Sequence, residues 1–322
     1  MRRRLAFGMG LAVLLALAGA AWLALPWYGA ANISEDTEFV VTDGATLTSA
    51  AAKLEEQGLI DSADAFLLRA KLLGGGGHIQ AGEFRLPAGA SNAAILDILQ
   101  SGEVIRRFVT IPEGLPSILV HERLMAEPLL TGELAVPDEG SVLPDTYSFE
   151  RGESRQAVLT RMQAAMDEAV AELWAQRSAQ AAVKTPEEAV ILASIVEKET
   201  GTAEERPMVA GALSNRLRIG MMLGADATTI YPITKGKPLG RMIRVSELRD
   251  RNPYNTRAVA GLPPGPITNP GREAIRAVLN PAETDALYYV ADGTGGHVFA
   301  RTLAEHNANV AKWRVYRREK GI

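Results

Sequence analysis

The pattern of hydrophobic and polar residues changes several times along the chain. No charged residue occurs from Leu5 through Ser34. Short alternations of an apolar segment, a glycine and a segment with helical period follow up to about residue 125. A run that is apolar on every side then leads into Glu197-Lys198-Glu199, and beyond Gly220 the chain is dense in Gly, Pro, Asn, Thr and Tyr. Each of these segments predicts a different kind of structure.

The uncharged N-terminal segment predicts a membrane-spanning helix over residues 5–27. Such a helix would be about 34 Å long, which is enough to cross a bilayer. Trp22, Trp27 and Tyr28 lie near its end, where aromatic side chains meet lipid headgroups. Ala18-Gly19-Ala20 resembles a signal-peptide cleavage site, but the apolar run continues beyond it, which favours an uncleaved anchor.

Three arginines precede the apolar run, at positions 2–4. By the positive-inside rule they predict a cytoplasmic tail at residues 1–4. The rest of the chain is then expected on the periplasmic side of the inner membrane, beginning with a linker at 28–37.

Residues 38–107 predict a small α/β module. A strand and a Gly turn lead into a helix with Leu47, Ala51 and Leu54 on one face, and Ser62–Leu73 is expected as a second helix. IQAGEFRLPAGASNAAILDILQSG then repeats the strand–glycine–helix pattern. This organisation suits a binding module and a simple support for the next domain equally well.

The run AVILASIVEKETG predicts a buried helix that ends in two carboxylates. Thr185 and Glu188 form a capping box with Pro186 at the first helical position, and Gly201 is expected to end the helix. Glu197 and Glu199 lie on opposite sides of the last turn, at 100° per residue. Partial burial and the negative end of the helix dipole both raise the pKa of a carboxyl there, as a proton donor at neutral pH requires. The alternative is an ordinary surface Glu paired with Lys or Arg.

Residues 108–322 predict a mostly helical domain with short strands and long polar loops. A long amphipathic helix is expected over Leu159–Gln180, and a second capping box, Thr202 to Glu205, opens a helix that ends at Gly220. The loops beyond Gly220 carry polar and aromatic side chains suited to a sugar, although each alone is equally explained by turn formation. These side chains are Asp226, Thr228, Tyr254, Asn255, Thr256, Asn269 and His297.

Composition narrows the function. A formal net charge of −4 without an internal basic run argues against nucleic acid as a partner. The absence of cysteine excludes disulfides, thiolate catalysis and Cys-ligated metals. The four His show no metal-ligand spacing, so no structural metal is expected.

Several motifs together resemble the endolytic murein transglycosylase (MltG, YceG-like) family. They extend over nearly the whole chain after residue 38, behind the single N-terminal anchor. In order they are AGEFRLPAG, TIPEG, EGSVLPDTYSF, ILASIVEKET, SNRLRIGMMLGADATTIY, NPYNTRAVAGLPPGPITNPG and NPAETDALYYVADGTGGHVFARTLAEHN.

The resemblance implies an α+β protein with a transmembrane helix, a LysM-like module at 38–107 and a YceG-like catalytic domain at 108–322. It implies a lyase that cleaves the MurNAc–GlcNAc β-1,4 bond within nascent peptidoglycan strands, leaves 1,6-anhydro-MurNAc ends and so terminates glycan elongation. Glu197 would be the catalytic acid, without metal or cofactor, and Glu199 and Arg216 would support it. Peptidoglycan synthases are the expected protein partners. Substrate would be bound by Asp226, Thr228, Tyr254, Asn255, Thr256 and His297.

Three alternatives remain open at the level of sequence. One is an anchored glycan-binding scaffold without catalysis. Another is a hydrolytic muramidase with Asp226 or Glu199 as its second carboxylate, because glycoside hydrolysis uses two. The third is a pyridoxal-phosphate lyase, which we disfavour because neither Lys198 nor Lys235 lies in a phosphate-binding context.

Overall fold

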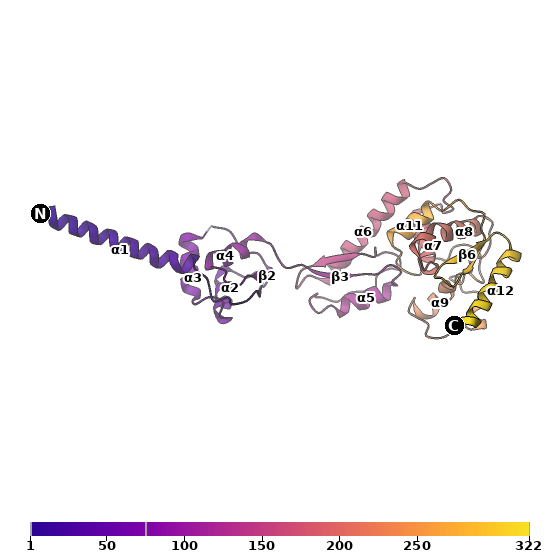
Figure 1. Ribbon diagram of the computed structural model, residues 1–322, viewed down its shortest axis with the longest axis horizontal. Coiled ribbons are helices and arrows are strands. Elements are labelled where there is room, and N and C mark those ends of the chain that lie inside the picture. The colour runs from indigo at the N-terminus through magenta and orange to yellow at the C-terminus, as the bar shows by residue number, and fades with distance from the viewer. Residues whose placement is uncertain (1, 75, 322) are drawn as a thin grey trace. The chain divides into compact units, whose positions relative to one another are not determined.

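The computed structural model describes residues 2–74 and 76–321 and shows a mixed α+β protein (Figure 1). It divides into two compact units: unit 1 is Met1–Arg107 with Phe149–Gly152, and unit 2 is Phe108–Ser148 with Glu153–Ile322. The elements of unit 1 are α1 (Arg2–Tyr28), β1 (Thr37–Val41), α2 (Leu47–Glu56), α3 (Ala63–Leu73), β2 (Gly82–Leu86) and α4 (Asn92–Ser101).

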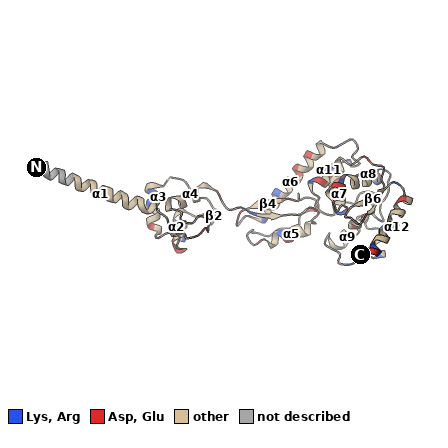
Figure 2. Ribbon diagram, in the orientation of Figure 1, with Lys and Arg blue, Asp and Glu red and all other residues tan. Residues whose placement is uncertain are grey.

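Helix α1 is long and apolar enough to cross a membrane. Its candidate span is Met9–Tyr28, with a mean hydropathy of 2.0. Figure 2 shows no charged residue along this span. The expectation of a single N-terminal apolar helix is thus confirmed by its length and composition.

We expected Trp27 in an aromatic belt in the headgroup region, but the structure places it in a protein core. Its side chain is only 1% exposed and packs against Phe66 of α3, with ring centroids 5.5 Å apart. Trp22 and Tyr28 remain largely exposed. The last turn of α1 is therefore part of the core of unit 1, because burying the indole stabilises the unit more than leaving it at the membrane surface.

Unit 1 is built on a two-stranded antiparallel sheet in which Thr37 of β1 pairs with Leu86 of β2 and Val41 pairs with Gly82. Helices α2 and α3 connect the two strands. Side-chain oxygens cap the first turns of α2, α3 and α4, as the Ser and Thr preceding each helix predict. Residues 30–33, within the expected linker, hydrogen-bond to the loop before α4. The core includes Phe39, Leu54, Phe66, Phe84 and Leu99.

Unit 2 contains the remaining elements, except that Arg107 of β3 and Phe149 of β4 belong to unit 1. The strands β3 (Arg107–Thr110) and β4 (Thr146–Phe149) form one pair, and β5 (Tyr288–Ala291) and β6 (His297–Ala300) form another. The helices are α5 (Ser117–Ala126), α6 (Arg155–Ala175), α7 (Pro186–Glu199), the 3₁₀ turn η1 (Ala203–Glu205), α8 (Arg206–Arg218), α9 (Asp226–Thr234), α10 (Val245–Arg249), α11 (Arg272–Leu279) and α12 (Leu303–Lys320).

Helix α7 lies at the centre of unit 2 and packs against α6, α8, α9 and α11. Its residues Ala189–Val196 are buried on nearly all sides, as the uniform apolar pattern predicts. Thr185 caps its first turn by accepting from the Glu188 amide, and Pro186 is the first helical residue. This central position holds the end of α7, with its two carboxylates, in a fixed place.

Two expectations about neighbouring helices are wrong. The amphipathic helix α6 spans Arg155–Ala175 rather than 159–180, because Ser154 caps it earlier and residues after Gln176 leave the helical path. Thr202 forms no capping box, because the carboxylate of Glu205 is bonded to His297 instead.

Candidate active site

The side chain of Glu197 lies at the end of α7 and is only 6% exposed. Its Oε2 accepts a hydrogen bond from the amide of Gly271, at 3.0 Å. Its Oε1 lies 3.2 Å from Nη2 of Arg206, the first residue of α8. The carboxyl group is therefore held from two sides, by the start of the next long helix, α8, and by a loop 74 residues further along the chain.

A second carboxylate shares the same arginine. Oε2 of Glu113, in the TIPEG segment before α5, lies 2.6 Å from Nη2 of Arg206. Glu113 is 41% exposed, whereas the Arg206 side chain is 16% exposed. One guanidinium nitrogen thus links a buried carboxyl, Glu197, to a solvent-accessible one, Glu113.

These contacts set the protonation of Glu197. Burial raises its pKa above the ordinary carboxyl range, because the charged form is penalised away from water. The Gly271 amide and the Arg206 charge oppose that shift, while the negative charge of Glu113 adds to it. The result is a carboxyl group with a raised pKa that also has partners for its ionised form, which suits a group that gives up a proton and takes one back.

The loop that carries Gly271 is fixed by hydrogen bonds to buried side chains. Ser194, inside α7, accepts from the amide of Ile267 at 3.1 Å. Asn269 is fully buried; its amide group donates to the carbonyl of Leu115, and its Oδ1 accepts from the amide of Val142. Because Leu115 follows TIPEG directly, Asn269 ties the Gly271 loop to the segment that carries Glu113.

Two glycines allow the close approach at this site. A Cβ on Gly271 would come within 2.1 Å of Oε1 of Glu113. Gly114 has φ +71°, and a Cβ there would lie 3.3 Å from Cγ of Glu197. The backbone at Gly271, with φ −73°, is open to any residue, but a side chain there would displace the Glu113 carboxylate from its present position.

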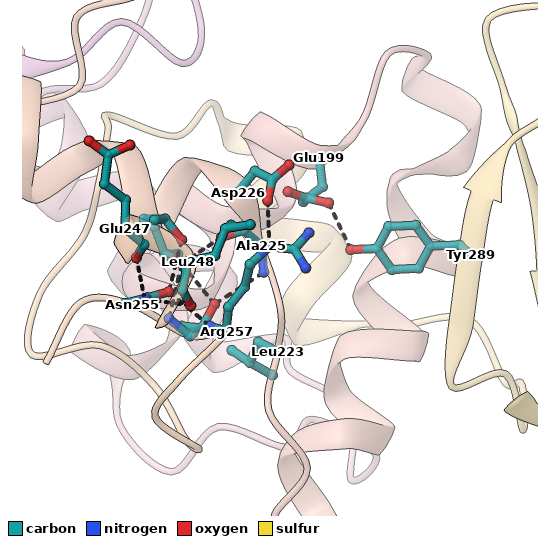
Figure 3. A network of polar contacts seen from close by, with 12 residues as sticks. Glu199, Leu223, Ala225, Asp226, Glu247, Leu248, Asn255, Arg257 and Tyr289 are labelled. Carbon is teal, nitrogen blue, oxygen red and sulfur yellow. Dashed lines mark hydrogen bonds and ion pairs between the residues drawn. The ribbon is translucent and has the colours of Figure 1, made fainter. Parts of the chain in front are cut away.

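Glu199 lies on the other side of α7, as the helical spacing predicts, and has different partners (Figure 3). Its Oε2 accepts from the hydroxyl of Tyr289 on β5, at 3.0 Å. Burial raises the pKa of Glu199 and raises that of Tyr289 well above its ordinary value. The Glu199 carboxyl is already bonded to Tyr289, which fits a supporting role.

Among the residues expected to bind substrate, Asp226 and Tyr254 are partly exposed to solvent. Asp226, at the start of α9, is paired with Arg257 and is about half exposed (Figure 3). Tyr254 is partly buried against Tyr231, with ring centroids 4.9 Å apart. Substrate contact by these two remains a prediction.

Thr228, Asn255 and Thr256 instead form an internal network, with side chains 0–1% exposed. The hydroxyls of Thr228 and Thr256 lie 2.8 Å apart, and Thr256 accepts from the amide of Ala225. The amide group of Asn255 donates to the carbonyls of Glu247 and Asp250, and its Oδ1 accepts from the hydroxyl of Thr229. Their polar groups are already bonded inside the protein, where they shape the loop, and substrate contact by these three residues remains a prediction.

His297 and Arg216 also have internal partners. Glu205 accepts from the backbone amide of His297 at 2.7 Å and lies 2.8 Å from its Nδ1. Glu205 directly precedes Arg206, so the β5–β6 hairpin holds the turn that carries this arginine. Arg216 donates to the carbonyls of Leu223 and Leu287 and is largely buried, which lowers its pKa.

Sequence reasoning missed four participants: Glu113, Arg206, Asn269 as a structural link, and Gly271. TIPEG and NPG were noted as motifs, but neither carries a chemical pattern that points to Glu197. Position 113 lies 84 residues before Glu197, and only the tertiary fold brings them together.

Comparison with known proteins places the chain in a family. The model of the YceG-like family matches residues 39–312. An endolytic murein transglycosylase of Bacillus subtilis is 27% identical over 312 residues, which cover 87% of this chain and 85% of that protein. A protein of the same name from Streptococcus pneumoniae strain D39 is 29% identical over 331 residues.

The chain spans 59% of the length of the pneumococcal relative, and the match covers 88% of the chain. The crystal structure of a YceG-like protein from Listeria monocytogenes superimposes with a TM-score of 0.54 at 25% identity, covering 85% of this chain and 98% of that one. Because the family model matches most of the sequence, the chain belongs to the YceG-like family.

Proposed function

We propose that this chain is an endolytic murein transglycosylase that cleaves the MurNAc–GlcNAc β-1,4 bond within peptidoglycan glycan strands. The observation that carries the proposal is Glu197: a buried carboxyl with a raised pKa that is held beside an Arg206–Glu113 pair. The names of the Bacillus and Streptococcus relatives support the same activity.

The proposed reaction needs one carboxyl group acting twice. Protonated Glu197 donates its proton to the glycosidic oxygen, and the bond from that oxygen to C1 of MurNAc breaks with oxocarbenium-like charge on the sugar. The Glu197 carboxylate then removes the proton from the C6 hydroxyl of the same MurNAc. The C6 oxygen bonds to C1, which gives a 1,6-anhydro end and regenerates protonated Glu197 without consuming water.

The neighbours of Glu197 fit this cycle. The carboxylate that exists between the two proton transfers is stabilised by the Gly271 amide and by Arg206, whose contacts are already in place. Glu113 balances the charge of Arg206 and keeps that arginine from holding Glu197 permanently ionised. We assign Arg206 and Glu113 as positioning residues for Glu197.

The pair of carboxylates Glu197 and Glu113 would also suit one competing function. A hydrolytic muramidase needs a second carboxylate to activate water or to act as nucleophile. The structure makes Glu113 a better candidate than Asp226 or Glu199, because it shares Nη2 of Arg206 with Glu197 and is solvent-accessible. The two functions differ in product, since hydrolysis leaves a reducing MurNAc end.

Unit 1 is proposed to bind and place the enzyme. The order β1-α2-α3-β2, with β1 and β2 antiparallel, supports a LysM-like module that binds glycan. Helix α1 is proposed as a single-pass inner-membrane anchor with residues 1–4 in the cytoplasm, so that unit 2 acts in the periplasm on nascent strands. There it would terminate glycan elongation beside peptidoglycan synthases.

The proposal is tested by comparing Glu197→Gln with Glu199→Gln in the full chain. Gln keeps the shape of the side chain but cannot transfer a proton, so we expect Glu197→Gln to lower the cleavage rate by at least about 10²–10⁴-fold. Glu199→Gln should keep much more activity. Thermal melting and binding to purified glycan strands serve as controls, and both should be retained by Glu197→Gln.

Two outcomes would contradict this assignment. If folded Glu197→Gln cleaves normally while Glu199→Gln is inactive, the roles of the two carboxyls are reversed. If the wild-type chain binds glycan strands without cleaving them, the non-catalytic scaffold is correct.

A further inference from the structure

Helix α3 carries leucine side chains that the described residues of unit 1 leave exposed. Its inner side contributes Phe66 and Ala70 to the core. On its outer side Leu68 and Leu72 are 46% and 57% exposed, and the following Leu73 is 36% exposed. Exposed apolar side chains that lie together on a protein surface mark an interaction site.

The contacts of α3 with α1 give the direction of this face. Phe66 packs against Trp27, with ring centroids 5.5 Å apart. Three residues later, the guanidinium of Arg69 lies 5.4 Å from the ring centroid of Trp22. The two contacts indicate that α3 runs antiparallel to α1. From residue 66 to residue 69 of α3, the contacting residue of α1 changes from 27 to 22, which lies about 7.5 Å closer to the apolar N-terminal part.

Leu72 and Leu73 continue in that direction. They lie at the end of α3, beyond Arg69, and so farther toward the apolar segment of α1 than Trp22. Trp22 itself lies inside the candidate span Met9–Tyr28. An exposed Trp beneath an Arg guanidinium is the pairing expected where a protein meets lipid headgroups, because both side chains combine an apolar body with a polar end.

The connection between α1 and the rest of unit 1 is held by packing and hydrogen bonds. Trp27 is buried, and Nδ2 of Asn92 donates to the carbonyl of Pro26 at 2.8 Å. The amide of Ala31 donates to the carbonyl of Ala90 at 2.9 Å. A bilayer around α1 therefore has a defined position relative to α3.

We propose that the exposed end of α3, with Leu68 and Leu72 on its outer side and Leu73 in its last turn, rests in the headgroup region of the membrane leaflet at the C-terminal end of α1. This inference depends on the proposed anchor. The occupant is lipid because the face continues the exposed apolar surface of α1, and because the exposed Lys71 places a cation where lipid phosphates lie. Unit 1 then lies against the membrane surface instead of extending from it on a free tether.

The absence of cysteine from the chain allows a direct test. The variant Leu72→Cys, in the full chain, is labelled with an environment-sensitive fluorophore and reconstituted into single-copy lipid nanodiscs. Some nanodiscs contain lipids with a nitroxide quencher near the headgroup. We expect a blue-shifted emission and a severalfold loss of intensity with the nitroxide lipid.

Two control positions separate this inference from the anchor. Glu56→Cys, exposed on α2, should be neither shifted nor quenched. Leu17→Cys, in the middle of α1, should be quenched by nitroxides placed deep in the acyl chains. If Leu17 is quenched and Leu72 behaves like Glu56, the anchor stands and the docking of α3 is wrong.

The remaining outcomes are also decisive. A blue-shifted Leu72 label that nitroxide lipids do not quench would show that protein covers this face, which overturns the proposal. An unquenched Leu17 label would show that α1 is not in the bilayer, which removes the anchor and this inference together.

Discussion

At the scale of single residues, the environment of Glu197 holds opposing effects in balance. Burial and the negative charge of Glu113 favour the protonated form, whereas Arg206 and the Gly271 amide favour the ionised form. A carboxyl exposed to only one of these influences would remain protonated or remain ionised. Both forms are needed when one group serves as acid and then as base.

The balance predicts opposite pH effects for the two partners of Glu197. Glu113→Gln removes a charge that raises the pKa of Glu197, so the alkaline limb of the kcat/KM profile should move to lower pH. Arg206→Gln removes a charge that lowers this pKa, so the limb should move to higher pH. The measurement is the pH dependence of glycan cleavage.

A matched control is Glu172→Gln, since Glu172 is an exposed carboxylate paired with Arg272 and has no contact with Glu197. Its profile should match that of the wild type. Shifts in the same direction for Glu113→Gln and Arg206→Gln would show that these residues affect folding or binding rather than the protonation of Glu197.

Glu199 predicts a pH-dependent stability. Burial raises its folded pKa above the ordinary value of 4.5, so the folded state binds this proton more tightly than the unfolded state. Its contribution is most favourable below about pH 4.5 and declines as pH rises through the folded pKa. The melting temperature of Glu199→Gln minus that of the wild type should therefore increase with pH.

Glu187→Gln, on the first turn of the same helix, is the control with the opposite sign. Hydrogen bonds to backbone and to Thr185 lower the pKa of Glu187. Because the folded protein stabilises the ionised form of Glu187, the melting temperature of this variant should drop increasingly below that of the wild type as pH rises. A difference for Glu199→Gln that does not change with pH would contradict the account.

At the scale of elements, sequence reasoning succeeded where local signals agree with the tertiary fold. The Thr185 cap, Pro186 and the unbroken apolar run specify α7 almost to the residue, because capping and burial act on the same segment. It failed at Thr202, where the expected capping partner, Glu205, is used by His297 from a distant hairpin. A local pattern cannot reveal a competing partner 92 residues away.

The polar loops show the same limit for the candidate site. Asn255 and Thr256 have side chains able to bind a sugar, but the fold uses those groups to hold its own backbone. Glu113 and Gly271 could not be assigned from sequence because their importance is spatial: a loop and a turn meet Glu197 only after folding. Residue type indicated chemistry, while burial determined which residues remain available for it.

The junction of α1 with unit 1 gives a prediction at this scale. Trp27→Ala should destabilise unit 1 by about 3–5 kcal/mol, because it removes a buried aromatic side chain and leaves a cavity. Trp22→Ala, which truncates a Trp that is 62% exposed, should cost much less. Chemical denaturation of the full chain in detergent measures both, and equal costs would contradict the placement of Trp27 in the core.

At the scale of the whole molecule, three structural parts follow one another along the chain. An apolar helix fits a membrane anchor, unit 1 is rigidly continuous with that helix, and unit 2 holds the candidate active site around α7. A soluble fragment that begins at residue 29 would lose Trp27 from the core of unit 1. Activity is therefore best measured on the full chain.

The most direct test of the proposed function is the mass of the ends that the full chain creates in uncrosslinked glycan strands. The account predicts new 1,6-anhydro-MurNAc ends, each lighter by one water than a reducing end, and none with Glu197→Gln. Because internal cleavage is proposed, the products should be oligosaccharides of mixed length rather than disaccharides released from one terminus. New reducing MurNAc ends would contradict the mechanism and identify a muramidase that uses water at the same site.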